Sequence, residues 1–196
     1  MSTRRALTLL YAAFWLRLLL VPLSFYVAPQ LDGTYGAALG ALPVGVTVLC
    51  LAGFSLLGRG DARSALFAQL TAAVIATEVL FDLVMLCAPE RLAHLPVVYL
   101  VEVIALAMLV GSWATLSALA RELGTELPAA LGAFFCFTVA VRAGLYGARA
   151  SLSMHDGIDL HRIDMQSALA LVVALALPLL EAIAVGTVRR GSDGAC

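Results

Sequence analysis

The chain alternates between long apolar stretches and short polar breaks. Six stretches each have about 20 residues or more, the length that an α-helix needs to cross the hydrocarbon core of a bilayer. They cover residues 6–27, 35–57, 64–87, 95–118, 128–148 and 166–188. No stretch alternates apolar and polar residues with a period of two, which disfavours a transmembrane β-barrel. The pattern predicts an all-α, polytopic membrane protein: a single domain over residues 1–196, built as a six-helix transmembrane bundle.

The composition agrees with a lipid environment. The 196 residues are 62% hydrophobic and 13% charged, whereas a soluble domain is about half apolar and about a quarter charged. The formal net charge is −1, and there is no basic arm, so nothing indicates nucleic-acid binding. We therefore expect the lipid bilayer of the cell membrane to surround the chain, with a bacterial inner membrane as the expected location.

The arginines predict the orientation, because cytoplasmic loops of membrane proteins carry an excess of positive charge. With the N-terminus in the cytoplasm, seven arginines fall on the inner side and three on the outer side. The inner ones are Arg4, Arg5, Arg59, Arg63, Arg121, Arg189 and Arg190, and the outer ones are Arg91, Arg149 and Arg162. We predict that both termini are cytoplasmic and that the segment 149–165 is an outer loop.

Several charged residues lie within the predicted membrane-spanning stretches. Five lie well inside the apolar stretches: Arg17, Glu78, Glu102, Arg142 and Glu181. An ionised group at the centre of a bilayer costs about 3 kcal/mol on insertion scales, so such residues normally face the bundle interior and pair with one another. Pairing, protonation or a wet cavity is therefore expected at these positions.

Three charged residues share one predicted depth in the outer half of the bundle. Asp82, Glu102 and Arg142 should lie roughly 7–11 Å below the outer edge of the apolar layer. Tyr99 is one helical turn from Glu102, and Tyr146 is one turn from Arg142. These residues predict an outer-facing polar pocket between the third, fourth and fifth stretches, in which Arg142 pairs with Asp82 or Glu102.

A second set of residues is typical of a proton path. Glu78 is the deepest acid and shares a helix face with Asp82, four residues later. By depth, Arg17 is the expected counter-ion of Glu78. Glu181 follows Pro178 by three residues, and a broken helix beside an acid recurs at the ion sites of transporters. A carboxyl that changes its protonation state can act as a relay.

The predicted outer loop is the most polar part of the chain, but it matches no established metal-ligand spacing. A solvated loop is the preferred interpretation of its side chains, and a metal or catalytic site and a partner contact are the alternatives. The side chains are His155, Asp156, Asp159, His161 and Asp164. No histidine lies in the middle of a stretch, which argues against a transmembrane bis-histidine haem. The sequence also lacks phosphate-binding and zinc-protease motifs. We expect no metal and no cofactor.

The leading functional interpretation is a small transport or channel-type protein. A small solute or ion would move past Glu78, Asp82, Glu102 and Arg142, with proton coupling through Glu78. One alternative is an accessory subunit, whose charges pair with each other, with a second copy of the chain, or with a partner membrane subunit. Another is an intramembrane enzyme with its site near the outer surface, and catalysis is the less favoured interpretation.

Overall fold

The part of the chain that the structure describes forms six α-helices, and the prediction of an all-α fold is confirmed for that part. The computed structural model describes residues 2–23, 34–60, 62–87, 95–156 and 164–194, without a strand among them. Its helices are α1 (Ser2–Pro22), α2 (Thr34–Leu57), α3 (Arg63–Cys87), α5 (Leu95–Glu122), α6 (Ala129–Asp156) and α7 (Asp164–Gly194).

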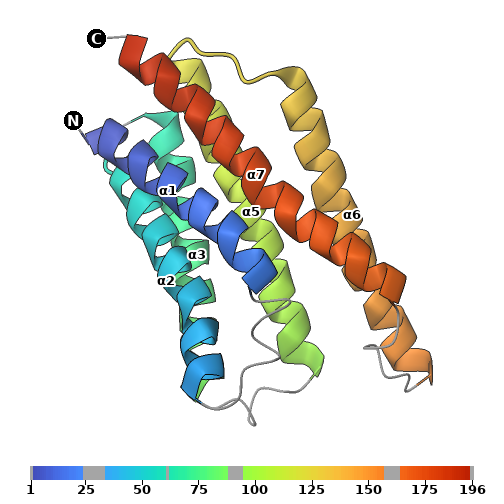
Figure 1. The fold of residues 1–196 in the computed structure, drawn as a ribbon. Helices are drawn as coiled ribbons and strands as arrows, with labels where there is room; N and C mark the ends of the chain where they lie inside the picture. The colour runs from blue at the N-terminus through green and yellow to red at the C-terminus, as the bar shows by residue number, and fades with distance from the viewer. Residues whose placement is uncertain (1, 24–33, 61, 88–94, 157–163, 195–196) are drawn as a thin grey trace.

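The helices run alternately up and down, and both termini lie at the same end of the bundle (Figure 1). We call this the terminal end. Successive helices α1, α2, α3 and α5 pack side by side, and α7 returns to pack against α1. Helix α6 stands at the edge of the bundle, where it packs more extensively against α7 than against α5. The expected contact between the third and fourth stretches is thus extensive, whereas the contact between the fourth and fifth is slight.

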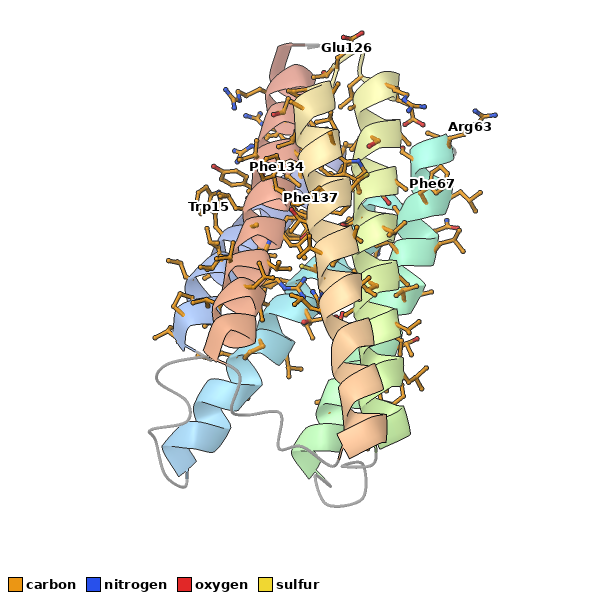
Figure 2. All side chains as sticks on the ribbon, turned by 90° about the vertical axis from the view of Figure 1, so that its right-hand side faces the viewer. Trp15, Arg63, Phe67, Glu126, Phe134 and Phe137 are labelled. Atoms are coloured by element: carbon orange, nitrogen blue, oxygen red, sulfur yellow. The ribbon has the colours of Figure 1, made fainter. Side chains whose placement is uncertain are left out.

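Four helices are long and apolar enough to cross a membrane. The qualifying segments are Thr3–Pro22, Arg63–Phe81, Glu102–Glu122 and Leu169–Ser192. The apolar parts that the structure describes in α2 and α6 are shorter, Ala41–Leu57 and Ala129–Leu145. Large apolar side chains also point outward, among them Phe134 and Phe137, which are 63% and 66% exposed (Figure 2). Apolar side chains inside and outside the bundle support a multi-pass membrane protein, since lipid solvates the outer ones.

Glycines allow the helices to approach closely. A Cβ atom added at Gly53 of α2 would lie 2.6 Å from a methyl carbon of Leu10 in α1. One added at Gly111 of α5 would lie 2.6 Å from the hydroxyl oxygen of Thr71 in α3. Helices in lipid associate through close packing of this kind, because no hydrophobic effect drives them together.

The terminal end is closed by hydrogen bonds between helix ends. The Ser64 backbone N–H at the start of α3 donates to Oε1 of Glu122 over 2.9 Å, and the Ser64 hydroxyl donates to Oε2 over 2.5 Å. The Gln69 amide donates to the carbonyl oxygen of Gly58 over 2.6 Å. A carboxylate at a helix N-terminus is favoured by the helix dipole, so Glu122 fixes the end of α5 onto the start of α3.

The helices on either side of the predicted outer loop are longer than the apolar pattern indicates. Helix α6 continues to Asp156 and α7 begins at Asp164, so much of the segment 149–165 is helical. A helix satisfies its own backbone hydrogen bonds and does not have to end where the apolar residues end. Asp159 and His161 lie outside the described residues, as do the side chains of His155 and Asp156.

Candidate functional site

Three acidic side chains are buried among the helices. Glu78 of α3, Glu102 of α5 and Glu181 of α7 are 8%, 9% and 1% exposed. Each lies in a helix that is long and apolar enough to span a membrane. Since isolated carboxylates are costly in such a place, the partners of these three residues define the candidate site.

Glu102 has a cationic partner on the neighbouring helix. The Nε–H group of Arg142 in α6 donates to Oε1 of Glu102 over 2.5 Å, and the two side chains are 19% and 11% exposed. The prediction that Arg142 pairs with one of two acids is confirmed for Glu102. The side chains of Asp82, Tyr99 and Tyr146 lie outside the described residues, so the wider outer pocket stays a prediction.

Glu181 is the most deeply buried of the three acids. Its Oε1 atom is hydrogen-bonded to the hydroxyl of Ser112 in α5, and the same hydroxyl lies 2.9 Å from the carbonyl oxygen of Leu109. The Oε2 atom of Glu181 is fully buried and has no hydrogen-bond partner among the described residues. Buried polar atoms rarely lack a hydrogen-bond partner. A purely structural role of Glu181 therefore does not explain the position of its Oε2 atom.

Charges on three other helices act on Glu181. The guanidinium of Arg17 in α1 attracts it most strongly, Arg142 of α6 attracts it less, and Glu78 of α3 repels it. The helices that pack extensively against α1 are α2 and α7, which agrees with the action of Arg17 on Glu181. The pairing of Arg17 with Glu78 stays a prediction. The thiol of Cys50 in α2, 2% exposed, is near enough for Arg17, Glu181 and Glu78 to act on it as well.

We call these five ionisable residues the interior charge cluster: Arg17, Glu78, Glu102, Arg142 and Glu181. Four of them lie at a similar depth, about 20 Å from the terminal end by the helical rise of 1.5 Å per residue: Arg17, Glu78, Arg142 and Glu181. The cluster draws on α1, α3, α5, α6 and α7, and Cys50 of α2 lies beside it. All six described helices therefore meet around one charged interior.

Sequence reasoning missed Ser112, which links the cluster to α5. A single serine in an apolar stretch gives no more than a weak signal, although hydroxyls in membrane helices often hydrogen-bond to a neighbouring helix. Two further buried hydroxyls lie between Ser112 and the terminal end. Those of Thr71 and Thr115 are 3.3 Å apart and join α3 to α5. Thr115 lies one helical turn from Ser112 on α5.

A shallow hollow of about 470 Å³ lies at the terminal end, beneath the turn between α5 and α6. It is lined by Trp113, Arg121 and Glu126 and by other residues of the turn between α5 and α6. The indole of Trp113 stacks on the ring of Phe135, with centroids 4.4 Å apart. None of the five cluster residues lines this hollow.

Among the described residues, no group of three or more His, Cys, Asp or Glu side chains could hold a metal ion. Comparison with known protein families, with curated proteins and with solved structures finds no match for this chain. Its function is therefore argued from the interior charge cluster alone.

Proposed function

We propose that this chain is a small proton-coupled transport protein of the cell membrane. The interior carboxyls take up and release protons, while a small solute or ion passes Glu78, Asp82, Glu102 and Arg142. Ionisable residues within membrane spans are costly, and they commonly mark ion and substrate pathways or proton relays. The gathering of five such residues at the centre of one small bundle supports this function.

The buried carboxyl of Glu181 carries the proposal. A purely structural ion pair would be expected to satisfy both oxygens, because an unsatisfied buried polar atom costs about 1–3 kcal/mol. Glu181 instead has one oxygen without a hydrogen-bond partner among the described residues, and it is only 1% exposed. Local costs of this kind persist where function requires them.

In the proposed topology all six helices cross the membrane and both termini lie in the cytoplasm. Their common position at the terminal end (Figure 1) agrees with an even number of crossings. The arginines Arg4, Arg5, Arg63 and Arg121 also belong to helix segments at this end, as positive charge at the cytoplasmic side requires.

One observation favours a second candidate, an accessory subunit without transport of its own. The closed pair of Glu102 and Arg142 is also what a structural tie between α5 and α6 would look like, since buried ion pairs can fix the register of helices. An accessory subunit would co-purify with another chain in a fixed ratio, whereas a transporter of this kind would purify alone or as copies of itself.

Water access to the cluster tests the transport proposal, and Cys50 is a natural reporter for it. In a variant with Cys87→Ser, Cys136→Ser and Cys196→Ser, the remaining thiol lies beside the cluster. A charged methanethiosulfonate reacts with thiolates in water. We expect it to modify Cys50 in native membranes, because a transport cycle must open the cluster to one side of the membrane.

The matched control retains Cys136 alone. This thiol lies on the exposed surface of α6, where lipid should shield it from a charged reagent. Both variants must react fully in SDS. Failure of Cys50 to react in membranes, at acidic and alkaline pH alike, would show that the interior is never wetted and would rule out transport.

Proton movement is then measured directly. Proteoliposomes that contain a pH-sensitive dye should acidify when an inside-negative potential is imposed, faster than protein-free liposomes. The double variant Glu78→Gln with Glu181→Gln should lose this difference, whereas Glu122→Gln should keep it, since Glu122 binds Ser64 at the terminal end. Equal rates for the wild type and the double variant would contradict proton coupling through these acids.

A further inference from the structure

The described part of the interior charge cluster has more acids than bases. Three carboxyls, those of Glu78, Glu102 and Glu181, face two guanidiniums. Arg142 is hydrogen-bonded to Glu102. Arg17 is the guanidinium that attracts Glu181 most strongly. A carboxylate in a low-dielectric interior is costly to keep ionised, so proton uptake by one of these carboxyls lowers that cost.

The hydrogen bonds of Ser112 indicate which carboxyl holds that proton. A serine hydroxyl has one hydrogen to donate. The Ser112 oxygen lies 2.9 Å from the Leu109 carbonyl oxygen, and a carbonyl oxygen can only accept. If the hydroxyl hydrogen is directed to Leu109, the hydrogen between Ser112 and Oε1 of Glu181 belongs to Glu181.

We propose that Glu181 is the proton-binding carboxyl of the bundle, with the Ser112 hydroxyl as the acceptor that holds its acid form. This inference rests on the proposed function and names the residue that carries the proton. It differs from the expectation drawn from the sequence, which assigns the relay to Glu78. Proton uptake converts the Glu181 carboxylate to a carboxylic acid, and release returns the proton to water.

Each helix that packs against α7 presents a group to Glu181. Helix α1 presents Arg17 and α6 presents Arg142, both of which attract the carboxylate. Helix α5 presents Ser112, and its other interior acid, Glu102, is engaged by Arg142. Beyond these helices, Glu78 of α3 adds a like charge, and Cys50 of α2 feels the charge of Glu181.

These groups give Glu181 two alternative sets of interactions. The acid form donates to Ser112 and leaves the two guanidiniums less strongly attracted to it. The carboxylate form attracts Arg17 and Arg142 and needs no donor of its own. Proton binding therefore changes how strongly α1 and α6 are attracted to α7, which is a differential interaction of the kind that shifts a conformational equilibrium.

Infrared difference spectroscopy of the purified full-length protein in liposomes tests this assignment. A protonated carboxyl has a C=O stretching band above the amide bands, and titration from alkaline to acidic pH should make such a band appear. We expect Glu181→Gln to lose the band and Glu78→Gln to keep it. Ser112→Ala should shift the band to higher frequency, because a donated hydrogen bond weakens the C=O bond of the acid.

Thr138→Ala is the matched control, since this buried hydroxyl bonds to Phe134 in its own helix; the band should stay in place. Circular dichroism confirms that each variant is folded. Loss of the band in Glu78→Gln and not in Glu181→Gln would overturn the assignment, as would a band that never titrates. In either case the dye would still report proton uptake by the wild-type protein. If the proposed function is wrong, the dye would report no uptake beyond that of protein-free liposomes, whatever the spectra show.

Discussion

The ion pair of Glu102 and Arg142 can be dissected with single and double variants. Replacing Arg142 by leucine removes the guanidinium and leaves Glu102 without the group that donates to it over 2.5 Å. The chain should still insert, because the change makes α6 more apolar. The folded bundle, however, should lose stability, since the carboxylate remains among the helices.

The structure sets the size of the expected loss. Removing one partner of a fully buried ion pair costs about 3–5 kcal/mol. The two side chains are 19% and 11% exposed, which places Arg142→Leu near the lower end, about 3 kcal/mol. For a chain of this length, each kcal/mol corresponds to about 2–4 °C in melting temperature, so we expect a decrease of roughly 6–12 °C.

The double variant Arg142→Leu with Glu102→Gln should recover part of this loss, because no uncompensated charge of the pair remains. Unfolding by SDS in mixed micelles, followed by far-UV circular dichroism, measures all four proteins of the cycle. We expect a coupling energy of at least about 1.5 kcal/mol, the lower end of values for close charge pairs. Strict additivity, within about 0.5 kcal/mol, would refute the pair. Arg190→Leu at the exposed terminal end serves as the control for loss of an arginine.

Two further predictions concern packing and topology. Gly111→Ala should destabilise the bundle by about 1–3 kcal/mol through overpacking, because its Cβ would lie 2.6 Å from the Thr71 hydroxyl oxygen. Thr71→Ala should relieve this in the double variant, and Gly144→Ala should be tolerated, since nothing lies within 4 Å of its added Cβ. In a cysteine-free background, an impermeant thiol reagent should label Ser153→Cys in intact cells and Glu126→Cys, at the terminal end (Figure 2), after lysis alone. The reverse pattern would overturn the proposed orientation.

The helices could be predicted well because their determinant is simple. A bilayer requires about 20 apolar residues per crossing, and four of the six predicted stretches lie within the bounds of a helix. The fifth begins one residue before α6 at Ala129, and the first runs past the end of α1 at Pro22. The ends were less predictable. Helix α6 passes the end of its apolar stretch and reaches Asp156, because a helix can continue into polar surroundings with its backbone bonds intact.

The site could be predicted in depth but not in its lateral arrangement. Counting residues along the helices placed Arg142 and Glu102 at matching depths, and the structure joins them. The pairing of Arg17 with Glu78 stays a prediction, because depth says nothing about which helices are neighbours. The return of α7 to pack against α1 brings the charge of Arg17 to Glu181. No sequence pattern indicated that contact.

Helix α6 carries Arg142, which interacts with two acids, Glu102 and Glu181. This helix packs only slightly against α5, and the two helices are joined by the hydrogen-bonded pair with Glu102 and by the stack of Trp113 on Phe135. Arg142 also attracts Glu181 across the contact between α6 and α7. When Glu181 is a carboxylate, both acids attract the guanidinium; when Glu181 takes a proton, the attraction from Glu181 is lost. In the proposed mechanism, the balance of forces on α6 thus depends on one proton, as coupling between proton binding and movement requires.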